Sequence, residues 1–242
     1  MGFTPVLHSE WIKIRTLRSL VGSLGAVLLA TVAFSALAGV ATPSDGDDFD
    51  PLFAVFSGVS FGQIAAVTFG TTAVAAEFRT DAVRVSLAAV PQRGRWFTAK
   101  LTAIALPVLA VGLTTGLATL AVGSAVPGNK ADGLSTTESL RGVAGCAVYL
   151  TLMALLAAGL TALVRSGTGA LSILVPFLLI VSFVIGDLPG DVADFLPDRA
   201  GQVALHTRWD GVLGPWTGLA VTAAWALTAI VAGAWRIRQR DA

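Results

Sequence analysis

The densest group of potential metal ligands in this sequence is a short run of aspartates. They are Asp45, Asp47, Asp48 and Asp50. Carboxylate oxygens are ligands that Ca²⁺ prefers, but an EF-hand loop ends on a bidentate glutamate, and no glutamate follows these aspartates at that distance. We interpret the run as a solvated acidic loop and predict no metal site in the chain.

The other side chains that commonly carry catalysis lack the partners that their chemistry requires. His8 and His206 belong to no HExxH motif, and no GxSxG motif with a matching His and Asp indicates a serine hydrolase. Cys146 is the single cysteine, so it cannot form an intramolecular disulfide, and we interpret it as a packing residue. Neither GxxxxGKS nor GxxxxGKT occurs, which excludes ATP binding through a P-loop. We expect no catalytic residue and no cofactor in this chain.

The elements that would position these side chains are apolar runs long enough to cross a membrane. Hydrophobic residues make up 55% of the 242 residues and charged residues 13%, against about 25% charged in a soluble domain. A membrane-spanning helix needs about 20 apolar residues, and six runs approach or exceed this length. They are Ser19–Val40, Leu52–Ala76, Leu101–Val126, Gly142–Val164, Ala170–Gly186 and Pro215–Trp235. We predict an all-α integral membrane fold of six transmembrane helices in one domain, residues 1–242, with a tilted or broken fifth helix at Pro176.

The six runs contain no Asp, Glu, Lys, Arg or His, so they offer no group that would relay protons or bind sodium. Gln63 is their most polar side chain. It either lines a translocation path or hydrogen-bonds between helices, and the second interpretation is favoured. Three GxxxG pairs would let helices approach closely, but in a chain with 26 glycines such pairs also arise by chance. They are Gly58/Gly62, Gly112/Gly116 and Gly214/Gly218.

The charged residues predict how the chain is oriented in the membrane. If the termini and the even-numbered connections are cytoplasmic, 12 of the 16 Lys and Arg residues lie inside, and 11 of the 15 acidic residues lie outside. Cytoplasmic connections carry an excess of Lys and Arg. We therefore predict a multi-pass protein of the cell membrane with both termini in the cytoplasm.

Three segments outside the runs are also expected to form structure. Thr4–Arg18 is typical of an interfacial helix capped by Thr4, with Lys13, Arg15 and Arg18 facing lipid phosphates. The connection EFRTDAVRVSLAAVPQRGRWFTAK predicts a short helix from Thr80 to about residue 89, a basic turn, and a Lys100 side chain that extends to the membrane surface. The external segment 187–214 predicts one or two short helices resting on or dipping into the outer leaflet.

These segments resemble a known family. SEWIKIRT in a basic N-terminal helix, AAEFRTDAVRVSLAAVPQRGRWFTAK after the second span, and six spans in about 240 residues are similar to the small ABC type-2 exporter permeases of actinobacteria. The resemblance covers the whole chain in architecture and is most specific at residues 9–16 and 77–100.

The resemblance implies that two six-span subunits, identical or different, pair with separate ABC ATPase subunits that bind ATP and Mg²⁺. It places the helix after the second span, flanked by the N-terminal helix, at the ATPase interface. The implied interface residues are Glu77, Phe78, Arg79, Asp81, Arg84, Trp11, Lys13 and Arg15. Cargo would be hydrophobic or amphipathic, such as an antibiotic, peptide or lipid, with membrane lipids as further partners and no nucleic acid.

Two other hypotheses remain open from the sequence. One is a non-ABC membrane scaffold or accessory subunit, in which the basic connections only set the orientation. The other is an intramembrane enzyme or ion-coupled carrier, which the absence of charge from the six runs disfavours.

Overall fold

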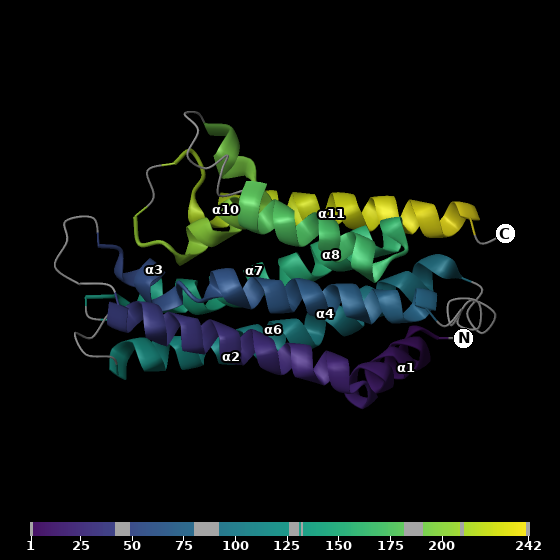
Figure 1. Cartoon of the computed structure of the whole chain (residues 1–242), viewed down its shortest axis with the longest axis horizontal. Helices are drawn as coiled ribbons and strands as arrows, with labels where there is room; N and C mark the ends of the chain where they lie inside the picture. Colours follow the sequence, from purple (N-terminus) through teal and green to yellow (C-terminus); the bar gives the residue numbers. More distant parts are fainter. Residues whose placement is uncertain are drawn as a thin grey trace.

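A computed structural model of the chain describes residues 2–41, 49–79, 92–125, 131, 133–181, 191–208 and 211–240. Every regular element in these residues is helical (Figure 1). Within the described residues, five helices are long and apolar enough to cross a membrane. They are α2 (Arg18–Ala41), α4 (Val59–Arg79), α6 (Arg93–Ala125), α7 (Thr136–Val164) and α11 (Pro215–Arg240).

The fifth apolar run forms a shorter helix than the other five. Its helix α8 covers Gly167–Pro176 and continues as the π-helical turn η1, Phe177–Val181. Fifteen helical residues extend about 22 Å, less than the roughly 30 Å of a hydrocarbon layer. The change to π geometry comes directly after Pro176, because proline has no backbone N–H and its ring disturbs the preceding turn. Residues 182–186 of this run lie outside the described part.

The second apolar run is interrupted, where the sequence predicts one continuous span. Helix α3 (Pro51–Phe56) begins after Asp50, which caps it, and α4 starts only at Val59. Between them, the backbone N–H of Gly58 donates to Ser35 Oγ at 2.9 Å. A Cβ built on Gly58 would lie 2.0 Å from the carbonyl oxygen of Thr31, so α2 contacts the backbone directly at this break.

The third span starts earlier than predicted. Gln92–Arg95 is expected to form a turn, but α6 already begins at Arg93. Trp96, in the first turn of α6, is only 1% exposed. It is buried because the N-terminal helix α1 (Phe3–Thr16) packs against α6 and α2 at this end of the bundle.

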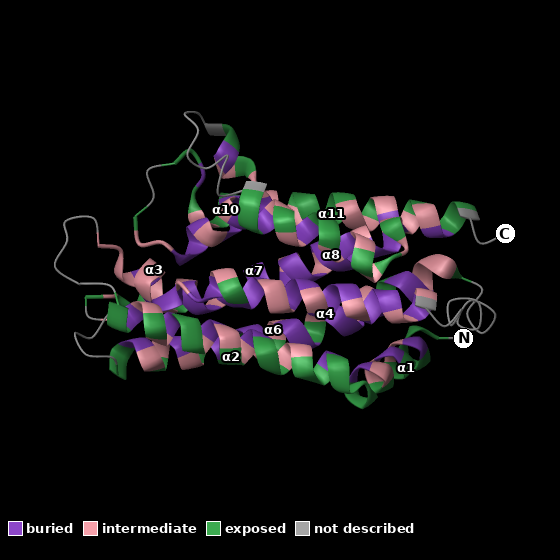
Figure 2. Cartoon of the chain, viewed as in Figure 1, coloured by how far each residue is buried: buried purple, intermediate pink, exposed green. Residues whose placement is uncertain are grey.

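Helix α7 forms the centre of the bundle, where it packs against α4, α6 and α11. Its most apolar stretch is 67% buried, whereas that of α2 is 22% buried. Figure 2 shows the same contrast, with broad exposed stretches on α2 and α11. Leu29, Leu37 and Val40 are each more than 60% exposed on α2. A soluble protein rarely exposes so much apolar surface, and a lipid environment accounts for it.

The segment before α11 folds against the bundle instead of resting apart from it. It contains the 3₁₀ turn η2 (Asp191–Phe195), α10 (Pro197–Gln202) and the 3₁₀ turn η3 (Val203–Leu205). Helix α10 packs on α11 and α7, and Thr222 Oγ1 of α11 donates to the Pro197 carbonyl oxygen at 2.8 Å. This segment lies at the end of the molecule opposite the two termini, which share one end (Figure 1).

Candidate functional site

Helix α1 forms a base across the end of the bundle where the termini lie. It starts at Phe3 after Gly2, one residue before the predicted start, and no side chain caps it. It ends at Thr16 instead of Arg18, because the chain bends at Leu17 before α2 begins. Its buried face consists of Val6, Glu10 and Ile14. A carboxylate on a buried face requires a partner, since an unpaired buried charge is strongly destabilising.

Four charged side chains meet beneath this face in a closed ring, which we call the ionic ring: Glu10, Lys13, Glu77 and Lys100. Lys13 Nζ lies 2.9 Å from Glu10 Oε1 and 2.8 Å from Glu77 Oε1. Lys100 Nζ lies 2.7 Å from Glu77 Oε1 and also binds Glu10 Oε2. Two carboxylates thus alternate with two ammonium groups, and their formal charges cancel.

The ionic ring is largely shielded from solvent. Glu10, Glu77 and Lys100 are each less than 5% exposed, whereas the side chain of Lys13 is 36% exposed. Burial alone would lower the pKa of Lys13, but hydrogen bonds to Glu77 and Glu10 outweigh it and raise the pKa above its ordinary value. Lys13 therefore stays protonated, and the ring joins α1, the end of α4 and the start of α6.

The predicted interface residues are only partly brought together. Lys13 and Glu77 are in direct contact. The guanidinium carbon of Arg165 lies over the Phe78 ring, 5.6 Å from the ring centroid. Trp11 is half-buried and Arg15 is exposed on α1.

The rest of the predicted interface falls outside the described structure. Arg79 is the last residue of α4, and its side chain lies outside the described part. Asp81 and Arg84, together with the predicted helix 80–89, lie outside the described residues. Their predicted role is therefore neither supported nor contradicted by any contact.

Two expectations about lysines are wrong. Lys13 is expected to face lipid phosphates, but it binds two carboxylates. Lys100 is expected to extend to the membrane surface, but it is 4% exposed and paired inside the bundle. In both cases a nearby buried carboxylate is a stronger partner for the ammonium than the lipid surface.

Glu10 and Lys100 were not predicted to be site residues from the sequence. One signal was present, since Glu10 and Lys13 are three residues apart and share a helix face. Another was that Glu77 and Lys100 carry opposite charges at the two ends of one connection. Only the position of α1 shows that the two pairs join.

A second polar group lies inside the bundle, around Gln63 of α4. Its Oε1 accepts a hydrogen bond from the Tyr149 hydroxyl of α7, and both residues are buried. Gln202 of α10 donates to the Tyr149 hydroxyl at 3.3 Å and accepts from Ser60 Oγ at 3.2 Å. Gln63 therefore hydrogen-bonds between helices, in a network that extends to α10.

A third polar group links the opposite end of the bundle. Both Asp50 carboxylate oxygens accept from the Thr207 backbone N–H at 3.0 Å, and one lies 3.1 Å from His206 Nδ1. The ring of His206 stacks on Phe53 with centroids 4.3 Å apart. Arg141 of α7 donates to the His206 carbonyl oxygen at 2.7 Å. Asp50, expected in a solvated loop, thus fixes the segment after η3 to α3, and Arg141 fixes it to α7.

No group of three or more His, Cys, Asp and Glu side chains in the described ranges is arranged to hold a metal ion. Cys146 is buried in α7. No protein-family model matches the chain, and no curated protein matches it significantly. The geometry of the three polar groups is therefore the basis for assigning a function.

Proposed function

We propose that this chain is the six-span permease subunit of an ATP-driven ABC exporter, with both termini in the cytoplasm. It would form the translocation path together with a second permease subunit, identical or different. A separate ATPase chain would bind and hydrolyse ATP with Mg²⁺. The family resemblance of residues 9–16 and 77–100 motivates this proposal.

The single observation that carries the proposal furthest is the ionic ring. Its members come from α1, from the end of α4 and from the start of α6, and the last two flank the connection 80–91. A force applied to that connection would move α4, α6 and α1 together, because the ring holds their ends to one another. Such a mechanical link is what a permease driven by an external motor requires.

The interior of the bundle supports an apolar or amphipathic cargo. The polar side chains around Gln63 are satisfied by one another, and α7 contributes an almost wholly apolar centre. An apolar interior offers little to a strongly charged solute, since transferring an unpaired charge into it is costly. Antibiotics, peptides and lipids are cargo classes that fit.

The alternative to which the structure adds an observation is an ion-coupled carrier, because the ionic ring contains two buried carboxylates. Each of them is paired with lysine, which favours a fixed structural role over proton relay. The two alternatives differ in their energy source. Export by an ATP-driven permease should continue when an uncoupler collapses the proton gradient at constant ATP, and loss of export would support the carrier.

The decisive experiment is co-purification of the chain with an ABC ATPase from the same cells. We expect a stable complex whose ATPase binding is weakened by Arg84→Glu or Arg15→Glu, with unchanged membrane insertion. Arg208→Glu is the matched control, because Arg208 is an exposed arginine at the opposite end of the bundle. Absence of any complex would favour the scaffold hypothesis, and an equal effect of Arg208→Glu would overturn the proposed interface.

A further inference from the structure

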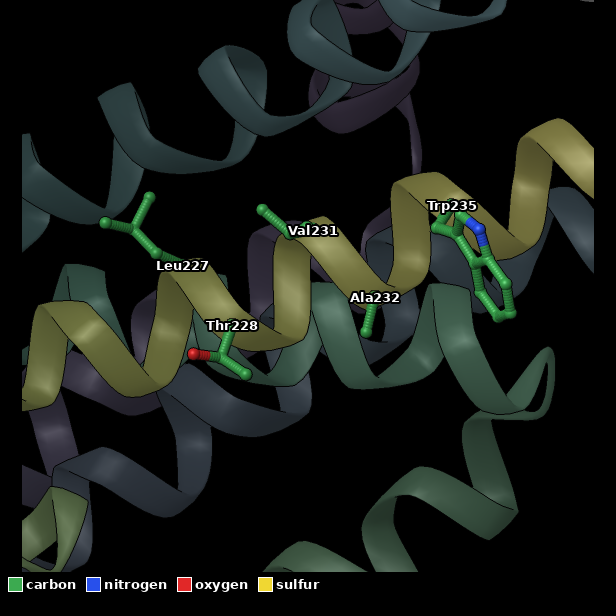
Figure 3. Close-up of a pocket in the computed structure, with 5 residues that line it drawn as sticks. All are labelled: Leu227, Thr228, Val231, Ala232 and Trp235. Atoms are coloured by element: carbon green, nitrogen blue, oxygen red, sulfur yellow. The ribbon is translucent and has the colours of Figure 1, made fainter.

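An open apolar groove runs along the outer face of α11 near its C-terminal end. It has a volume of about 580 Å³ and is lined by Leu227, Thr228, Val231, Ala232 and Trp235 (Figure 3). Leu227, Val231 and Trp235 are each more than half exposed.

On each side of this groove, the next residue at helical spacing toward the C-terminus is an arginine. Residues three or four apart share a face of a helix. Thr228 and Ala232 are followed on their stripe by Arg236, and Val231 and Trp235 by Arg238. Arg238 is exposed, and the Nε atom of Arg236 is buried without a hydrogen-bond partner among the described residues. The groove therefore has an apolar length and a cationic end.

The arginine end is built from two helices. Arg93 of α6 donates to the Ile237 carbonyl oxygen at 2.8 Å and to that of Arg238 at 3.3 Å, which fixes the end of α11 against the start of α6. A Cβ built on Gly94 would lie 3.5 Å from an Arg238 guanidinium nitrogen, so Arg238 extends over the start of α6. The positive charge therefore has a defined position at the end of the groove.

We propose that this groove binds one acyl chain of an anionic phospholipid, whose phosphate is held by Arg238. Charge complementarity selects this occupant, because a phosphate beside an apolar chain matches a guanidinium group beside an apolar groove. Trp235 lies between the apolar lining of the groove and the arginine end. Indole rings are enriched at the level of the lipid headgroups, which agrees with this position. A protein partner fits less well, since a specific protein interface buries about 1,000 Å² or more. This assignment does not depend on the proposed exporter function.

The test compares the affinity of the full chain for phosphatidylglycerol and phosphatidylcholine of equal chain length, measured by native mass spectrometry. We expect a preference for phosphatidylglycerol. Arg238→Gln should weaken phosphatidylglycerol binding about five-fold, because one basic residue near an anionic headgroup contributes about 1 kcal/mol. It should leave phosphatidylcholine binding nearly unchanged. Ala232→Leu, which fills the groove, should weaken both lipids alike.

Two matched variants make the result decisive. Arg208→Gln removes an exposed arginine at the opposite end of the bundle, and Ala220→Leu enlarges an exposed alanine of α11 outside the groove. Both should bind the two lipids as the unmodified chain does. The proposal is wrong if Arg208→Gln lowers the preference as much as Arg238→Gln, if Arg238→Gln leaves the preference intact, or if Ala232→Leu and Ala220→Leu have equal effects.

Discussion

At the scale of single residues, the two lysines of the ionic ring share their carboxylate partners but differ in exposure. The side chain of Lys100 is 4% exposed and that of Lys13 is 36% exposed. Removing Lys100 would leave two buried carboxylates with one partly solvated ammonium between them. Removing Lys13 would leave Lys100 in contact with both carboxylates.

Lys100→Met should therefore destabilise the protein by about 3–5 kcal/mol, the cost of breaking a buried ion pair. Lys13→Met should cost only about 1 kcal/mol, because a partly exposed pair is screened by solvent. Denaturant titration of the purified variants in detergent measures both losses of stability. Equal costs for the two variants would show that the ring is more hydrated than its burial indicates.

The carboxyl group of Asp50 gives a prediction about pH. Burial would raise its pKa, but the contacts with His206 and the backbone amides of Phe53 and Thr207 outweigh burial and hold the pKa well below its ordinary value of 3.8. A carboxyl group with a lowered pKa in the folded state adds stability above its unfolded pKa, and this contribution is lost as the pH falls below it.

Asp50→Asn should therefore destabilise the protein at pH 5 by about 1 kcal/mol, because the hydrogen bonds that the Asp50 carboxylate accepts are stronger than those to a neutral amide oxygen. The difference from the unmodified chain should shrink at pH 3. Melting temperatures at the two pH values test this, because only carboxyl groups titrate in that interval. A difference that stays constant from pH 5 to pH 3 would mean that Asp50 is not held as an anion.

At the scale of helices, the contacts between backbones are set by glycine. A Cβ built on Gly159 of α7 would lie 2.6 Å from backbone atoms of Ala229 and Ile230 in α11. On α2, by contrast, a Cβ on Gly25 would have no atom of the described residues within 4 Å. The two positions therefore differ in packing while both lie inside apolar helices.

Gly159→Ala should force α7 and α11 apart and lower stability by about 1–3 kcal/mol, the usual cost of overpacking. Gly25→Ala should be neutral or slightly stabilising, because alanine favours a helix over glycine. Thermal unfolding of the two variants side by side measures the contrast. A destabilised Gly25→Ala would indicate that another surface covers α2 at this point.

How far the sequence predicts the helices depends on what determines each boundary. Both ends of α2 and the C-terminal end of α7 lie within one residue of the ends of the apolar runs, and hydropathy alone places them. The start of α7 at Thr136 lies six residues before its run, because Ser135 and Glu138 form a capping box there. The break at Gly58 depends on Ser35 and Thr31 of a neighbouring helix, which hydropathy does not register. Among the GxxxG pairs, Gly112 and Gly116 do contact α7 through Ala147 and Val143.

The candidate site was harder to predict for the same reason. Glu10 and Lys100 are 90 residues apart, and each alone looks like an ordinary charge at a membrane surface. Their pairing depends on the path that α1 takes across the bundle. Local spacing predicts contacts within one helix, whereas this contact is tertiary.

At the scale of the whole molecule, the common position of the two termini gives a test of orientation. Val192 is 78% exposed at the end opposite the termini, and Gln239 is exposed near the C-terminus. The native Cys146 is buried, so it should not react with the thiol reagent.

In intact cells, Val192→Cys should react with a membrane-impermeant maleimide and Gln239→Cys should react only after permeabilisation. The charge asymmetry of the chain is the physical reason, since Lys and Arg concentrate at the end near Gln239. Gly94→Cys should behave like Gln239→Cys. Labelling of Gln239→Cys in sealed cells would reverse the orientation and place the N-terminal helix outside.

The closed geometry of the ionic ring has a consequence for biosynthesis. Glu10 leaves the ribosome 90 residues before Lys100, a delay of about 5–18 s at ordinary rates of translation. Throughout this interval the nearest cation available to Glu10 is Lys13, one helical turn away. The nascent N-terminal helix therefore carries its own temporary counterion, and it reaches its final position only when the third long helix has been made.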